Sequence, residues 1–194
     1  MFTRIECKQP GCSKFQVASS PFCPEHHPDK PTLMADLKNH FAKEQVHSNG
    51  KYTGLTFVDF DFSGKQWICC DFSHSTFQGC SFENASFMLC FFEHTRIEDS
   101  IFDHHHSMES TMARSVIRNS RFHQSQSILT SYNGAIIQGC SFTGSDLMYS
   151  RFIETRLTNV ELNDCNLKST HFISTKFEQV NFSYSNREDA LYEP

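Results

Sequence analysis

Residues 69 to 87 read CCDFSHSTFQGCSFENASF, with a phenylalanine at every fifth position, namely 72, 77, 82 and 87. Five residues of α-helix turn a side chain through about 500°, so these rings would not share one helical face. In a continuous strand successive side chains alternate between two faces, so rings five apart would point in opposite directions. The period of five therefore predicts a repeating structure that is neither a helix nor a long strand.

The same register runs from position 52 to position 182 without an insertion, and we call the residues at these positions centres. Of the 27 centres, 25 are large and apolar, and the exceptions are Ser107 and Ser127. A chain with 38% apolar residues would give about ten by chance. Two residues before the centres, positions 70 to 180 hold only small residues except at His105. Alternating large and small residues are what a narrow, filled interior requires.

Units such as CDFSH, CSFEN, SRFIE and VNFSY resemble the repeats of the pentapeptide repeat family. The resemblance implies an all-β fold, a right-handed quadrilateral β-helix, or solenoid, of about seven coils, with four units in each coil and the large and small positions of the unit pointing inward. Residues twenty apart would then stack. We expect a zinc-binding segment at 1–30, a short helix and linker or cap at 31–50, the β-helix at 51–186, and a tail at 187–194.

Stacking at intervals of twenty sorts the centres onto four sides. The fourth side, whose centres are Trp67, Phe87, Ser107, Ser127, Leu147 and Leu167, differs from the others because its outward residues are apolar. We call the following set the apolar stripe: Ile68, Met88, Leu89, Met108, Ile128, Leu129, Met148 and Tyr149. A contiguous apolar patch of this size on a soluble protein usually has a partner.

Three interpretations of the apolar stripe stay open at this point. In the first interpretation, the coil bulges near residues 104–106 and turns Met108 and Ile128 inward. Alternatively, a helix within residues 31–47 covers the stripe, because Leu33, Leu37 and Phe41 have helical spacing and Pro31 suits a first helical turn. In the third interpretation the stripe is an intermolecular contact, with a second copy in a homodimer or with another protein.

The N-terminal segment has the spacing C-x4-C-x10-C-x2-H, formed by Cys7, Cys12, Cys23 and His26. Three thiolates and an imidazole are a common tetrahedral zinc set, and so short a segment cannot bury a core of its own. We expect one structural zinc ion here, with His27 as the alternative fourth ligand. The outline is also loosely similar to small zinc knuckles found at the ends of phage and bacterial proteins.

Composition narrows the function classes. A net charge of −5 disfavours direct nucleic-acid binding through a basic patch. No apolar run is long enough to span a membrane and no signal core begins the chain, so we expect a cytoplasmic location. The odd count of nine cysteines disfavours a disulfide framework. No nucleophile elbow, phosphate loop or zinc-protease motif occurs, so an enzyme is not expected. The three consecutive histidines are interpreted as a polar surface cluster: His104, His105 and His106.

These features predict a non-enzymatic protein-interaction module whose protein partner the sequence does not identify. The alternative comes from the family, some of whose members resemble duplex DNA in size and negative charge and bind gyrase or topoisomerase IV. The resemblance thus implies a possible type II topoisomerase partner and protection from topoisomerase poisons. Six arginines interrupt the acidic surface of the repeat region, which weakens that alternative: Arg96, Arg114, Arg118, Arg121, Arg151 and Arg156.

Overall fold

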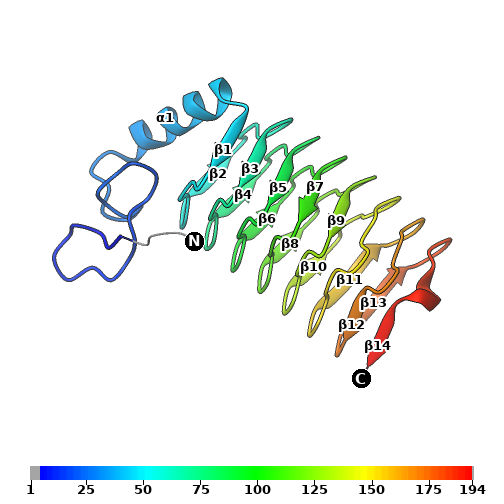
Figure 1. Ribbon diagram of the computed structural model, residues 1–194. Helices are drawn as coiled ribbons and strands as arrows, with labels where there is room; N and C mark the ends of the chain where they lie inside the picture. Colours follow the sequence, from blue (N-terminus) through cyan, green and yellow to red (C-terminus); the bar gives the residue numbers. More distant parts are fainter. Residues whose placement is uncertain (1–4, 194) are drawn as a thin grey trace.

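A computed structural model describes residues 5–193, which form one short helix followed by a rod of stacked coils (Figure 1). The elements are α1 (Lys30–Lys43), β1 (Val46–Ser48), β2 (Thr56–Val58), β3 (Gln66–Ile68), β4 (Thr76–Gln78), β5 (Ser86–Met88), β6 (Arg96–Glu98), β7 (His106–Met108), β8 (Val116–Arg118), β9 (Gln126–Ile128), β10 (Ile136–Gln138), β11 (Arg156–Glu161), β12 (His171–Ile173), β13 (Lys176–Asn181), the 3-10 turn η1 (Arg187–Asp189) and β14 (Leu191–Glu193). The predicted all-β solenoid of about seven coils is confirmed.

Every strand pair in the rod is parallel and joins residues twenty apart, such as Phe57 with Phe77 in β2 and β4. One side of the rod is a sheet with the order β1-β3-β5-β7-β9, and another has the order β13-β11-β10-β8-β6-β4-β2. A third, small sheet pairs β12 with β14. A step of twenty residues per layer is what four units of five residues in each coil require, so the period read from the sequence sets the strand register.

The centres form the core of the rod. On one side, the rings of Phe62, Phe82, Phe102, Phe122 and Phe142 stack in order, with centroid separations of 4.6, 4.2, 4.6 and 4.6 Å. The five small-position thiols of the rod are buried beside such rings, as expected: Cys70, Cys80, Cys90, Cys140 and Cys165. Large and small inward residues thus fill the interior in every layer.

The coil does not bulge at the two serine centres, so the first interpretation of the apolar stripe is wrong. Ser107 and Ser127 point inward and are buried, while Met108 stays 48% exposed. The imidazole of His105 is fully buried among the rings of Phe87, Phe102 and Phe122, so it fills the interior where the two serine centres are small. Its Nδ1 hydrogen-bonds the Phe102 carbonyl at 2.7 Å and its Nε2 hydrogen-bonds Ser127 Oγ at 3.2 Å. His105 is therefore not part of a surface cluster, and the large and small positions have exchanged roles in this layer.

The helix α1 lies across the open end of the first coil and not over the apolar stripe (Figure 1). Asp29 caps its N-terminus by accepting a hydrogen bond from the Thr32 backbone N–H at 3.0 Å, and Pro31 lies in its first turn, as predicted. The helix buries Leu33, Leu37 and Phe41. The Phe41 ring lies 5.0 Å from Trp67, which is the first centre of the fourth side. The interpretation in which the helix covers the stripe is therefore wrong, and its apolar face closes an exposed solenoid end instead.

The rod extends beyond the expected limits of 51 and 186. At the start, β1 pairs with β3 and places His47 in the position of a centre, stacked on Trp67 at 4.1 Å. At the end, β14 pairs with β12, so Tyr192 stacks on Phe172 at 5.4 Å. Among residues 5–193, no helix has the length and apolar character needed to cross a membrane.

Candidate metal centre and binding face

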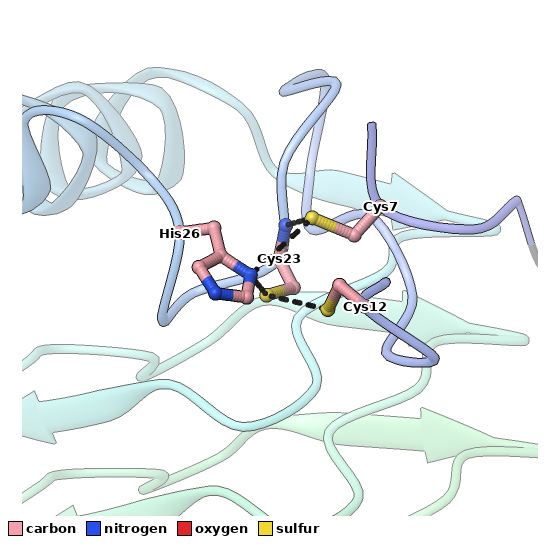
Figure 2. A group of neighbouring side chains, drawn as sticks. All are labelled: Cys7, Cys12, Cys23 and His26. Carbon is pink, nitrogen blue, oxygen red and sulfur yellow. Dashed lines mark hydrogen bonds between the residues drawn. The ribbon is translucent and has the colours of Figure 1, made fainter. Parts of the chain in front are cut away.

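Cys7, Cys12, Cys23 and His26 converge in the loops that precede α1 (Figure 2). Their candidate ligand atoms all lie within 4.8 Å of one another. Cys12 Sγ lies 3.9 Å from Cys23 Sγ, while His26 Nδ1 lies 3.4 Å from Cys23 Sγ and 3.8 Å from Cys7 Sγ. The four residues predicted from the spacing thus form one cluster.

The separations fit a tetrahedral zinc site. With Zn–S bonds of about 2.3 Å and Zn–N bonds of about 2.0–2.1 Å, tetrahedral ligand atoms lie roughly 3.6–3.8 Å apart. Three of the six separations, 3.4, 3.8 and 3.9 Å, lie close to this range, and all six are within 4.8 Å. His27 lies outside the cluster, because its Nδ1 accepts a hydrogen bond from the Asp29 backbone N–H at 3.2 Å. The cluster thus contains His26 and not His27.

The local electrostatics also suit a cation. Burial raises the pKa of the Cys7 thiol, but backbone N–H groups, led by that of Cys23 at 3.3 Å from its sulfur, and the neighbouring His26 outweigh this and bring it to about 6. The Lys14 N–H lowers the pKa of Cys12, yet burial and the adjacent thiols of Cys23 and Cys7 raise it overall. Thiols this close oppose each other's ionisation, which a bound divalent cation relieves.

The segment that carries the cluster packs against the first coil. Val17 is fully buried in the same core as the centres, and the Ala18 backbone N–H donates to the Lys51 carbonyl at 2.6 Å. Pro24 lies against Gly54, which adopts a left-handed conformation with φ +69°. An exposed ion pair between Lys14 and Glu25 links two parts of this segment. The cluster is therefore fixed to the rod and adjoins the capped end.

The apolar stripe lies on the flat face formed by β3, β5, β7 and β9 and continues into the next coil. Five of its side chains are 40% to 48% exposed: Met88, Leu89, Met108, Leu129 and Tyr149. Ile68, Ile128 and Met148 are partly exposed beside them. The structure therefore brings all eight predicted residues onto one surface.

Three stripe residues occupy the corners of the coils, where the backbone is left-handed. Leu89, Leu129 and Tyr149 have φ values of 54°, 54° and 61°. Corners on the other sides more often carry glycine, asparagine or aspartate, such as Asp59 and Gly79, which adopt this conformation at lower cost. Bulky apolar side chains at these corners are unfavourable both for the backbone and for solvation.

A shallow groove of about 780 Å³ runs beside the stripe. Leu89 and Leu129 form one border, small residues such as Thr111 and Ala113 form its floor, and Arg114 lies on the opposite border. The stripe is thus flanked by a concavity with a polar floor and both signs of charge.

Comparison with family models places this rod among known repeats. A model described as pentapeptide repeats (8 copies) matches residues 68–103, and one described as pentapeptide repeat region matches residues 115–192. Together they match more than half of the chain. This chain belongs to the pentapeptide repeat family. No curated protein matches it.

Solved structures similar to this pentapeptide repeat chain share little sequence with it. One is a trypsin-treated variant of QnrB1, a plasmid-mediated fluoroquinolone resistance protein, with 14% identity, a TM-score of 0.42, and coverage of 72% of this chain and 81% of that chain. Another is HetL, involved in heterocyst differentiation regulation in the cyanobacterium Nostoc sp. strain PCC 7120, with 10% identity, a TM-score of 0.31, and coverage of 80% and 92%. A third, from the Arabidopsis thaliana thylakoid lumen, has 15% identity, a TM-score of 0.30, and coverage of 65% and 70%.

Two residues of this pentapeptide repeat protein that matter for the sites are missed by sequence reasoning. Val17 anchors the metal segment in the core, and it has no periodic neighbours that would signal its burial. His47 extends the repeat by one centre, and following the period of five back from Tyr52 would have found it. The exchange of His105 with the serine centres had a signal in the sequence, because all three break the two columns within two adjacent coils.

Proposed function

We propose that this chain is a non-enzymatic protein-interaction module, a rigid pentapeptide-repeat rod that presents the apolar stripe as its binding surface. The observation that carries this proposal is the exposure of five large apolar side chains in adjacent layers, between 40% and 48%. Monomeric soluble proteins rarely expose a contiguous apolar patch larger than a few hundred Å². A partner would cover it.

The cost of the stripe supports a functional reason for it. Leu89, Leu129 and Tyr149 combine left-handed backbone with exposed apolar surface, although asparagine or glycine at these corners would be more favourable on both counts. The parallel pairing of β3, β5, β7 and β9 keeps the spacing of the face fixed, which suits a preorganised docking surface.

The Cys7, Cys12, Cys23 and His26 cluster is proposed as a structural zinc site. When bound, zinc would cross-link three loops that have little core of their own, and a complete set of four protein ligands leaves no open position for a reacting water. The site would hold the N-terminal segment against the first coil beside α1. Its role in this proposal is to stabilise the cap of the rod.

The alternative of DNA mimicry with a type II topoisomerase as partner has weaker support. Residues 51–194 hold 17 acidic and 11 basic side chains, so the excess of negative charge is small. Part of it is locally neutralised, because Glu98 pairs with Arg96 at 2.8 Å and with Arg118 at 3.3 Å. Asp103 pairs with Arg121 at 2.7 Å. A surface of alternating charges is a poor copy of a uniform phosphate backbone.

Affinity capture from lysate of the source organism tests the proposal. Wild type is compared with the Met88→Lys, Met148→Lys variant, and Val58→Lys is the matched control because Val58 is 48% exposed at the third position of a strand on another side. We expect a protein captured by wild type and the control but lost in the stripe variant. Capture that is equal for all three would contradict the proposal, and recovery of gyrase or topoisomerase IV subunits would favour the alternative.

A further inference from the structure

The size of the apolar stripe restricts the partners that fit it. The five half-exposed and three partly exposed side chains of the stripe offer on the order of 600 Å², the upper end of the patch sizes found on soluble monomers. Two such surfaces packed together would bury about 1,200 Å², which is the lower limit of a standard specific interface. The stripe is therefore large enough for a specific dimer of moderate affinity.

The flat face is compatible with packing against itself. The outward residues of β3, β5, β7 and β9 form straight columns, because each strand pairs in parallel with the residue twenty further on. A leading column contains Gln66, Ser86, His106 and Gln126, a central column contains Ile68, Met88, Met108 and Ile128, and a corner column contains Cys69, Leu89, Glu109 and Leu129. The stripe consists of the central column and the apolar members of the corner column. Two copies can meet face to face in two simple symmetric ways.

The position of Glu109 distinguishes these two arrangements. If the rods are antiparallel, each column meets the same column of the other copy, so Glu109 faces another Glu109 or the apolar Leu89 or Leu129. Either contact desolvates a carboxylate without a partner. If the rods are parallel, the two-fold axis runs along them and the corner column meets the leading column. Glu109 then lies opposite His106, and both side chains are exposed in the single chain.

We propose that a second copy of this chain docks on the apolar stripe with the two rods parallel, so that Glu109 of each copy lies opposite His106 of the other. This inference rests on the proposed function, because it assigns a partner to the same surface. The Met88, Met108 and Ile128 side chains of one copy then pack beside those of the other. The dimer is isologous. The corner residues Leu89 and Leu129 of each copy then cover Ser86 and Gln126 of the other.

Sedimentation equilibrium of the full chain, from about 1 µM to about 1 mM, tests the occupant. We expect a reversible dimer whose dissociation constant rises at least about tenfold in Met88→Lys, Met148→Lys and stays unchanged in Val58→Lys. A wild-type chain that is monomeric throughout overturns the inference. Capture of a different protein through the stripe would in that case leave the proposed function standing. A dimer that the stripe variant does not weaken overturns the location.

Oxidative cross-linking tests the orientation. The Met88→Cys variant is made on a Cys69→Ser background, so that the partly exposed Cys69 thiol does not react. In parallel rods the new thiols at position 88 of the two copies lie side by side. In antiparallel rods centred on Met108 they lie two layers apart, roughly 9–10 Å. We expect a disulfide-linked dimer for Met88→Cys and none for the control Val58→Cys. A dimer in solution that Met88→Cys does not cross-link overturns the parallel arrangement.

Discussion

The rod and the N-terminal segment obtain defined structures in different ways. In the rod, most large centres lie against another large residue twenty positions on, as in the 4.2 Å stack of Phe82 on Phe102. In the described part of the N-terminal segment, residues 5–29, only Cys7, Val17, Ser20 and Cys23 are buried. Periodic packing stabilises the first region, and the second depends on its ligand cluster and on the rod beneath it. The comparison teaches that loss of metal and loss of a ring should affect different parts of the molecule.

The largest expected effect separates the two regions by removing a metal ligand. Cys23→Ser takes away a fully buried member of the cluster, and structural zinc contributes about 10–16 kcal/mol to the folding of small domains. We expect about one zinc per chain in wild type and under about 0.1 in the variant by elemental analysis. Cys69→Ser is the matched control, since this half-buried thiol lies in the rod. Wild type without zinc would contradict the account.

The second effect removes a ring from the rod. Phe102 is fully buried between Phe82 and Phe122, so Phe102→Ala should lower the free energy of unfolding by about 3–5 kcal/mol. The zinc content should not change. The control is Tyr184→Ala, at a side chain that is 90% exposed, which should change the free energy of unfolding by under about 0.5 kcal/mol. Urea denaturation measures both, and a similar loss in the two variants would mean that the stacks do not stabilise the rod.

This difference between the regions also explains what the sequence could predict. The period of five, together with the resemblance to the pentapeptide repeat family, predicted the coil, the buried cysteines and the stripe, because each residue in the rod repeats its neighbours' environment. The spacing of Cys7, Cys12, Cys23 and His26 predicted their convergence from ligand chemistry alone. The sequence predicted a short helix and a linker or cap at 31–50 without deciding between a cap and a cover for the stripe, and the burial of His105 was not predicted. Each depends on a single tertiary contact. The position of α1 depends on the closure of one coil end, and the burial of His105 depends on the volume left by two serines.

The third effect tests the exchange of His105 with the serine centres through pH. Burial lowers the pKa of His105 to about 4, against an ordinary value near 6.5. As the pH falls, His105 therefore becomes protonated in the unfolded chain before it does so in the folded chain. The stability that neutral His105 contributes above about pH 6.5 is lost as the pH falls to about 4. We expect His105 to account for about 2–3 kcal/mol of the loss between pH 7 and pH 4.5.

His105→Met is the variant that isolates this contribution. Burial also lowers the pKa of His47 to about 4, and acid weakens metal binding, so wild type alone does not separate the causes. Urea denaturation at pH 7 and at pH 4.5 should show a smaller acid-induced loss in His105→Met than in wild type. An equal loss in both would show that His105 is protonated without cost in the folded rod.

The smallest effect concerns the junction between the regions. The Asp29 carboxylate caps α1 through the Thr32 backbone N–H at 3.0 Å and the Thr32 hydroxyl at 2.6 Å, and these bonds also lower the pKa of its carboxyl. Asp29→Ala should cost about 1 kcal/mol in thermal or urea unfolding. Asp29→Asn should recover most of it, since the amide oxygen also caps. No recovery would mean that the charge, and not the hydrogen bond, stabilises the helix.

Hydrogen exchange of the full chain, with and without a zinc chelator, tests the contrast between the two regions most directly. The account predicts that peptides within residues 5–29 lose their protection when zinc is removed, while peptides spanning β4 to β11 keep theirs. Peptides from α1 should respond less than the segment, because Leu33, Leu37 and Phe41 remain packed on the first coil. Unchanged exchange in residues 5–29, or loss of protection along the whole rod, would contradict it.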